Sequence, residues 1–168
     1  MKWNLLRIWD ELLTTFFFVG KVKYAPGTVA SIIPLSVLFI PMPTRLYFIG
    51  IAVIVLFVIS LSSIKRMELV HGDDAPQIVI DEIIGMLLVL FSPYIVFGPV
   101  WALIAFGFFR LFDIFKPYPI HLANNKKGSF WVLFDDVLAA VFAWVALHCI
   151  YQLSNIFGIY YLIKHLSQ

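Results

Sequence analysis

Charged residues are scarce in this chain. Asp, Glu, Lys and Arg make up 13% of its 168 residues, whereas soluble domains contain about 25%. Hydrophobic residues reach 62%, against about 45 to 50% in soluble domains. The net charge of +2 is small and the basic residues are scattered among apolar runs, so no nucleic-acid binding surface is expected. The composition predicts an integral membrane protein that forms a single domain, residues 1–168.

Cysteine is almost absent as well. Cys149 is the only one, which excludes an internal disulfide and a metal site built from cysteines. The four histidines show no ligand spacing and lie outside the acidic pairs described below. Any metal bound by this chain is therefore expected to have oxygen ligands.

Long apolar runs fill most of the sequence instead. A helix of about 20 apolar residues crosses a bilayer. We therefore predict an all-α, polytopic helical membrane protein with about five membrane segments, at residues 28–41, 45–63, 78–92, 97–115 and 132–153. The first segment contains Pro34 and can be short or re-entrant. A weaker, aromatic-rich stretch follows at 156–166.

The first nineteen residues have a different pattern. Their apolar side chains gather on one helical face, while most of their charged side chains fall elsewhere. This pattern predicts an N-terminal amphipathic helix that lies in the membrane interface.

Basic residues are distributed unevenly between the two sides of such a bundle. If all five segments cross, one side carries most of them, namely Lys2, Arg7, Lys21, Lys23, Lys65, Arg66, Lys116, Lys126 and Lys127, with Arg110 close by. The other side carries only Arg45 and Lys164. Because basic connections stay in the cytoplasm, the first side is predicted to be cytoplasmic.

The acidic residues fall on that same side, or within about two helical turns of it. Two acidic pairs, Asp81-Glu82 and Asp135-Asp136, sit in similar apolar surroundings, each with a small residue, Gly85 or Ala139, four positions after the first acid. A small residue on that helical face allows close helix packing. Carboxylates in membrane segments are costly, so they usually have a partner or a function.

Structural explanations compete with a functional one. Each acidic pair could mark the start of a helix, where the helix dipole favours anions. Asp113 does not fit, because it precedes Lys116 and Pro117 near the end of its segment. Arg110 and Lys116, three residues to either side, could compensate Asp113 in a structural ion-pair ladder. Both structural alternatives stay open at this level.

A divalent metal would relieve the repulsion among carboxylates gathered at one patch, although protonation would also do so. Oxygen ligands suit Mg²⁺, which also binds substrate phosphates. The candidate ligands and catalytic acids are Asp81, Glu82, Asp113, Asp135 and Asp136, with Asp74 as a weaker candidate. Arg110 or Lys116 would add a positive contact to phosphate, and one carboxylate would act as general base or, as a second option, as nucleophile. The hypothesis is metal-supported phosphoryl chemistry.

A turn before the first segment offers further phosphate contacts. Pro26-Gly27 suits a tight reversal, and Thr28 can cap the following helix. The Thr28 hydroxyl, exposed backbone amides and Lys21 or Lys23 could instead form an anion site beside the acids.

Four blocks stand in order between about residues 20 and 140: 25–31 (APGTVAS), 74–85 (DAPQIVIDEIIG), 109–120 (FRLFDIFKPYPI) and 135–140 (DDVLAA). Together they resemble the phosphatidylglycerophosphatase A family of membrane phosphatases. The chain departs from the family at Ala30 and Ala140, where glycine is frequent, and at 21–24, where the family has a Gly/Ser-rich stretch.

The resemblance implies a Mg²⁺-dependent enzyme of the bacterial inner membrane, with its active site facing the cytoplasm. Its expected reaction is removal of the terminal phosphate of phosphatidylglycerophosphate to give phosphatidylglycerol. Carried onto matching positions, it implies a metal and catalytic set of Asp81, Glu82, Asp113, Asp135 and Asp136, with phosphate contacts from Arg110, Lys116 and Thr28.

Other functions fit the sequence less well. A lipid phosphotransferase that uses CDP-activated substrates also has clustered aspartates, but its longer multi-Asp spacing is absent here. A transporter needs ionisable residues across the bilayer, and the distal halves of the segments have almost none. A structural subunit with helix-capping acids leaves Asp113 unexplained. The oligomeric state is open.

Overall fold

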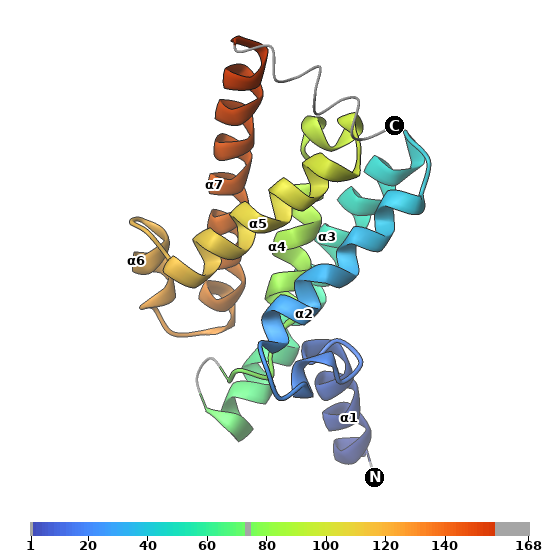
Figure 1. Cartoon of the computed structure of the whole chain (residues 1–168). Coiled ribbons are helices and arrows are strands. Elements are labelled where there is room, and N and C mark those ends of the chain that lie inside the picture. The colour runs from blue at the N-terminus through green and yellow to red at the C-terminus, as the bar shows by residue number, and fades with distance from the viewer. Residues whose placement is uncertain (1, 73–74, 157–168) are drawn as a thin grey trace.

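The computed structural model describes residues 2–72 and 75–156, and every regular element in these ranges is a helix (Figure 1). The elements are α1 (Lys2–Thr14), η1 (Val19–Lys21), α2 (Pro26–Ile32), η2 (Ile33–Phe39), α3 (Thr44–His71), α4 (Ile80–Leu90), η3 (Pro93–Phe97), α5 (Pro99–Phe115), α6 (Ile120–Asn124) and α7 (Ser129–Ile156). The predicted all-α fold is confirmed for the described residues.

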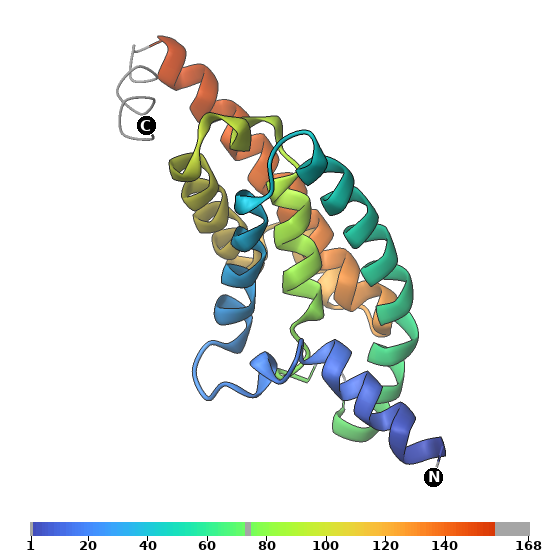
Figure 2. The same cartoon turned by 90° about the vertical axis from the view of Figure 1, so that its right-hand side faces the viewer.

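Helix α4 lies at the centre and packs against α2, α3, α5 and α7 (Figure 2). Nine of its 11 residues are buried, because nearly all of them are apolar and every side of the helix meets a neighbour. At Gly85 an added Cβ would lie 2.7 Å from the Phe109 ring of α5 and 3.2 Å from Cβ of Asp136 on α7. Glycine therefore allows the three helices to meet closely, as the sequence pattern predicted.

Helix α7 packs against both α4 and α5, and its buried residues include the small side chains of Ala139, Ala140 and Ala143. Farther along, the Trp144 indole nitrogen donates to the carbonyl oxygens of Leu88 and Val89, at 3.0 and 3.2 Å. These carbonyls belong to the last turn of α4, where they also accept from the amides of Phe91 and Ser92. The Gly85 contact and the Trp144 hydrogen bonds thus join α7 to both the first half and the end of α4.

Two of the described helices, α3 and α7, are long and apolar enough to cross a membrane. Only 22% of the most apolar window of α3 and 39% of that of α7 is buried inside the protein, so most of their apolar side chains face outward. The expected number of about five segments is not confirmed. Helix α4 has 11 residues, α5 has 17, and the first apolar segment is divided between α2 and η2.

The predicted N-terminal helix is present as α1, which packs against α3. Its contact face carries a polar pair that the sequence pattern did not reveal: Arg66 donates to both carboxyl oxygens of Asp10, each at 2.6 Å. Asp10 is 3% exposed, whereas Trp9 beside it is 67% exposed. The apolar residues of α1 therefore remain available to a membrane surface while an ion pair fastens the helix to the bundle.

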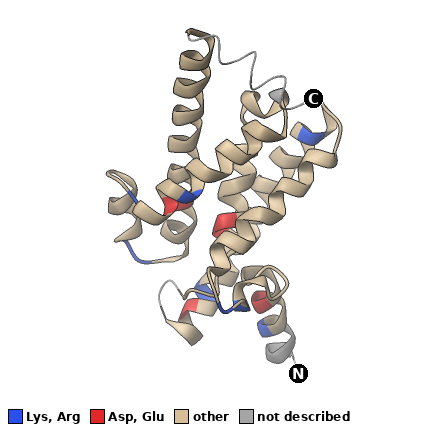
Figure 3. Cartoon of the chain, viewed as in Figure 1, with Lys and Arg blue, Asp and Glu red and all other residues tan. Residues whose placement is uncertain are grey.

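Most of the segments coloured for charged residues lie in the middle and lower parts of the molecule as drawn in Figure 3. The described carboxylates lie in α1, near the end of α3, in the first turn of α4, near the end of α5 and in the first half of α7. Arg45, at the start of α3, lies at the opposite end. The clustering of acids that the topology argument predicted is confirmed for the described residues; Lys164 lies outside them.

Candidate active site

A cavity of about 390 Å³ opens where the N-terminal ends of α2 and α4 meet the C-terminal end of α5 and the first half of α7. Most of the predicted site residues line it, together with several that were not predicted. The lining comprises Ala25, Pro26, Gly27, Thr28, Ala75, Pro76, Ile78, Asp81, Glu82, Arg110, Asp113, Ile114, Lys116, Asp135 and Asp136. Five carboxylates from three helices therefore share one cavity with two cations.

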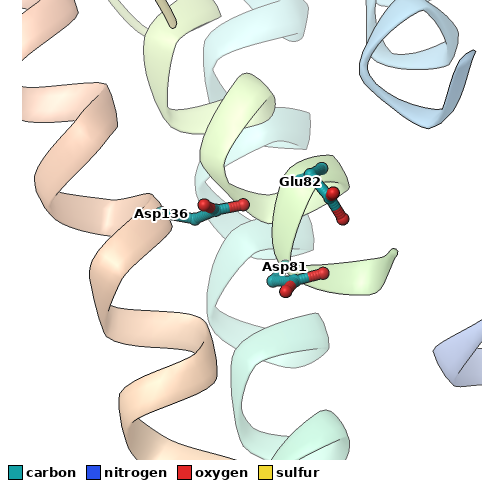
Figure 4. A group of neighbouring side chains, drawn as sticks. All are labelled: Asp81, Glu82 and Asp136. Carbon is teal, nitrogen blue, oxygen red and sulfur yellow. The ribbon is translucent and has the colours of Figure 1, made fainter. Parts of the chain in front are cut away.

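Three of these carboxylates converge closely. Asp81 and Glu82 come from the first turn of α4, and Asp136 extends from α7 toward them (Figure 4). One oxygen of each lies within 4.8 Å of the other two. Because α4 and α7 pack tightly at Gly85, one turn farther along α4, the two helices place their acids at the same level.

Each of the three has a buried carboxyl oxygen without a hydrogen-bond partner: Asp81 Oδ1, Glu82 Oε2 and Asp136 Oδ2. Asp81 is 9% exposed and Asp136 only 2%. A buried charge without a partner is strongly unfavourable, typically by several kcal/mol. Oxygen atoms arranged in this way fit a hard divalent cation, which binds carboxylates directly and prefers oxygen ligands.

The other two acids are paired within the protein. Arg110 Nη1 lies 2.5 Å from Asp113 Oδ2, and Lys116 Nζ lies 3.6 Å from Asp113 Oδ1. Lys116 also donates to Asp135 on α7. The ion-pair ladder that the sequence allowed at Asp113 is therefore present, and Lys116 extends it to a second helix.

Lys116 owes its position to the end of α5. It adopts a left-handed conformation, with φ 43°, and ends the helix just before Pro117, which has no amide hydrogen to continue it. Burial alone would lower the pKa of Lys116, but the charges of Asp135, Asp136 and Asp113 outweigh it and raise the pKa above its usual range. Lys116 therefore carries a positive charge at neutral pH.

The start of α2 forms the wall opposite α7. Gly27 packs against Glu82 so closely that an added Cβ would overlap Glu82 Oε1. Ser31, one turn later, donates to the Gly27 carbonyl at 2.7 Å and accepts from Arg110 Nη1 at 3.3 Å. Thr28 lines the cavity as predicted. Gly27 and Ser31 were missed, although their spacing of four residues places both on one helical face.

Helix starts explain only one of the two acidic pairs. Asp81 and Glu82 do lie in the first turn of α4, where the dipole favours them. Helix α7 instead begins at Ser129, so Asp135 and Asp136 fall in its second turn, beyond the reach of that effect. The α7 pair requires another partner, which Lys116 supplies for Asp135.

Two predicted phosphate contacts lie elsewhere. Lys21 pairs with Glu11 at 2.5 Å and lies over the Phe18 ring, with its nitrogen 4.8 Å from the ring centroid. Lys23 is exposed, with its nitrogen 5.4 Å from the centroid of the Tyr24 ring. The structure does not bring either lysine to the cavity lining. Asp74 lies outside the described residues.

Comparison with known proteins gives consistent matches over most of the chain. A Bacteroides thetaiotaomicron protein, provisionally named phosphatidylinositol-3-phosphatase, is 34% identical over 140 residues, which cover 80% of this chain and 88% of that protein. The phosphatidylglycerophosphatase A of Haemophilus influenzae is 34% identical over 150 residues, 83% of this chain and 87% of its own length. The protein of that name from Escherichia coli is 32% identical over 139 residues, covering 78% and 77%.

No solved structure matches the chain significantly. The family profile described as Phosphatidylglycerophosphatase A matches residues 12–151, a range that contains every residue lining the cavity. The described site therefore lies wholly inside the matched region, and the chain belongs to the phosphatidylglycerophosphatase A family of phosphatases.

Proposed function

We propose that this enzyme hydrolyses the terminal phosphomonoester of phosphatidylglycerophosphate, which yields phosphatidylglycerol and inorganic phosphate. The observation that carries the proposal is the cavity itself. It combines three buried, unpartnered carboxyl oxygens with Arg110 and Lys116, whose charges suit a phosphate group. Membership of the family and the names of two relatives support the choice of substrate.

The mechanism follows from the positions of the charges. Arg110 and Lys116 bind the phosphate oxygens, and the Thr28 hydroxyl adds a hydrogen bond from the α2 wall. A water oxygen forms the new bond to phosphorus while the bond from phosphorus to the glycerol oxygen breaks. One carboxylate of the set accepts the proton of the attacking water, and the glycerol oxygen gains a proton as it leaves.

Asp81, Glu82 and Asp136 would hold Mg²⁺, with Asp113 and Asp135 kept nearby through Arg110 and Lys116. When bound, the ion supplies positive charge to the phosphate oxygens and makes water a better nucleophile. Its presence would also offset the excess of negative charge, since five carboxylates face two cations in the cavity. The unpartnered oxygens support the proposed metal requirement.

We place the protein in the bacterial cytoplasmic membrane, with the site at the cytoplasmic face. Apolar residues at the cavity mouth support a membrane location: Phe115 and Tyr118 are exposed around the end of α5 that carries Lys116. Most of the segments that carry basic residues lie in the same half of the molecule, away from the start of α3 (Figure 3). A lipid in the inner leaflet could thus present its headgroup without leaving the bilayer. The remaining apolar segments would complete the membrane domain beside α3 and α7.

The test is phosphate release by the purified full-length protein in mixed micelles that contain phosphatidylglycerophosphate. We expect turnover with Mg²⁺, loss of turnover on chelation with EDTA and recovery when Mg²⁺ is added back. Full activity in EDTA would contradict the metal proposal. Absence of phosphate release with Mg²⁺ present would contradict the proposed reaction.

Phosphatidylinositol 3-phosphate is the second candidate substrate, because the provisional name of the Bacteroides relative points to it. Both lipids present a phosphomonoester on a glycerophospholipid headgroup, so the same cavity chemistry applies. The two are separated by measuring kcat/KM for each in identical micelles. We expect the glycerol phosphate to be preferred, and the reverse preference would reassign the substrate within the same reaction class.

A further inference from the structure

Arg45 lies far from the active site and has no ion-pair partner among the described residues. It is the second residue of α3 and is partly buried, and its Nε is buried without a hydrogen-bond partner. Glu68, near the other end of the same helix, lies 23 residues away, about 35 Å at 1.5 Å per residue. Arg45 is therefore at the membrane side opposite the acids.

The position of Arg45 in α3 makes its unpaired charge still less favourable. The first turn of α3 contains no acidic residue, and the amide groups of a helix N-terminus carry partial positive charge. A cation at this position is disfavoured by the helix dipole. A second unfavourable term comes from partial burial of a guanidinium with an unpaired nitrogen. An anion supplied from outside the chain would remove both.

The space beside Arg45 is large and apolar. A cavity of about 760 Å³ is formed by η2, the start of α3, η3 and the start of α5, and Arg45 is the charged residue in its lining. Ile33, Leu38, Ile95 and Pro99 contribute to its apolar walls. Volumes of about 300 to 1,000 Å³ are typical of ligand sites.

We propose that this cavity binds an anionic glycerophospholipid of the far leaflet, with its phosphate on Arg45 and part of an acyl chain between η2 and η3. An inorganic anion would pair with Arg45 but leave the apolar walls unfilled. A lipid without net charge would fill the walls but leave the cation uncompensated. Only an amphipathic anion matches both parts, and guanidinium groups bind phosphate oxygens in pairs.

Lipid binding is tested on the full-length protein in neutral detergent, with phosphatidylglycerol as the probe and phosphatidylcholine of the same acyl chains as the comparison. Thermal unfolding and native mass spectrometry report binding. We expect phosphatidylglycerol to raise Tm and phosphatidylcholine to have little effect. R45Q should weaken phosphatidylglycerol binding at least tenfold, while the matched variant K65Q, at an exposed position near the other end of α3, should bind as the wild type does.

The variant is also its own folding control. Because Arg45 has no partner in the described structure and its charge is unfavourable there, R45Q without added lipid should be at least as stable as the wild type. Equal effects of phosphatidylglycerol on R45Q and wild type would overturn the proposal. The absence of any effect on the wild type would also overturn it, and would indicate that another part of the chain fills the cavity.

Cross-linking separates this site from the active site, which would also bind phosphatidylglycerol if it is the product. A phosphatidylglycerol with a diazirine at the end of one acyl chain should label Phe39, Ile95 or Val96, which line the cavity. This labelling should decrease in R45Q and not in K65Q. Labels confined to the surroundings of Asp81 would contradict a second lipid site.

Discussion

Asp10 and Asp136 are almost equally buried, with exposed fractions of 3% and 2%, yet their surroundings differ. Asp10, between α1 and α3, has both carboxyl oxygens bonded to Arg66 at 2.6 Å. Asp136, between α7 and α4, has one oxygen with no partner at all. The two aspartates are therefore equally buried, but only Asp10 has a hydrogen-bonded cation for both of its carboxyl oxygens.

The difference lies in how many cations each region supplies. One arginine faces one aspartate at the α1–α3 contact, and the planar guanidinium matches both carboxyl oxygens. In the cavity, Arg110 pairs with Asp113 and, at 3.9 Å, with Glu82, and Lys116 pairs with Asp113 and Asp135, so two cations face five carboxylates. The first arrangement serves folding, whereas the second leaves buried carboxyl oxygens that the proposed metal ion would bind.

Removal of one excess charge should have the largest effect on activity. Asp136→Asn is expected to lower kcat by about 10²- to 10⁴-fold, because a proposed metal ligand and candidate base is lost. Its Tm in the absence of metal should stay the same or rise, because repulsion among the three carboxylates decreases. Phosphate release and thermal unfolding in EDTA measure the two quantities. Normal turnover of this variant would show that Asp136 is not needed for catalysis. Loss of folding would show that Asp136, like Asp10, serves stability.

A change in the shape of the cavity, without a change in its charges, should have the next largest effect. Gly27→Ala places a methyl group where Glu82 Oε1 now lies, so the carboxylate must move. A displacement of a catalytic group by about 1 Å can cost on the order of 100-fold in rate, and we expect a loss of about 10- to 100-fold in kcat.

Gly107→Ala is the matched control on α5, where an added Cβ has nothing within 4 Å. It should keep full activity and be slightly more stable, since alanine favours the helix by about 0.5 to 1 kcal/mol. If both glycine variants lose activity equally, the loss does not come from Glu82.

The helical fold was predictable because apolar runs and their boundaries are local properties of the sequence. Helix α4 shows the limit of that argument. Residues 78–92 suggested a membrane segment, but the helix has 11 residues and is buried on all sides, a pattern that a run of apolar residues also produces. Periodicity does not distinguish a neighbouring helix from surrounding lipid, because both present an apolar surface. The number of spans therefore stays a prediction.

The sequence predicted which acids form the site, but not which of them pair with cations. Sequence spacing identified Arg110 and Lys116 as partners of Asp113, since residues three apart on a helix are neighbours. It could not show that Lys116 also binds Asp135 of α7, because that contact joins residues 19 apart through tertiary packing. The same limit hid the Arg66–Asp10 pair, which spans 56 residues, and the contact of Gly27 with Glu82.

The smallest effect on catalysis should come from the α1–α3 contact, where the comparison predicts a loss of stability alone. Asp10→Asn leaves the Arg66 guanidinium without its charged partner, and we expect a loss of about 1 to 2 kcal/mol, reduced from the value of a buried pair because the Arg66 side chain is 44% exposed. For a chain of this size that corresponds to a decrease in Tm of about 2 to 8 °C. Turnover per folded molecule should remain within about twofold, because neither residue lines the catalytic cavity.

The double variant Asp10→Asn with Arg66→Gln is the control. It should lose less stability than the sum of the losses of the two single variants, since both substitutions remove the same interaction. Additive losses, or a large decrease in kcat without a decrease in Tm, would show that α1 acts on the active site and is more than a helix fastened to α3.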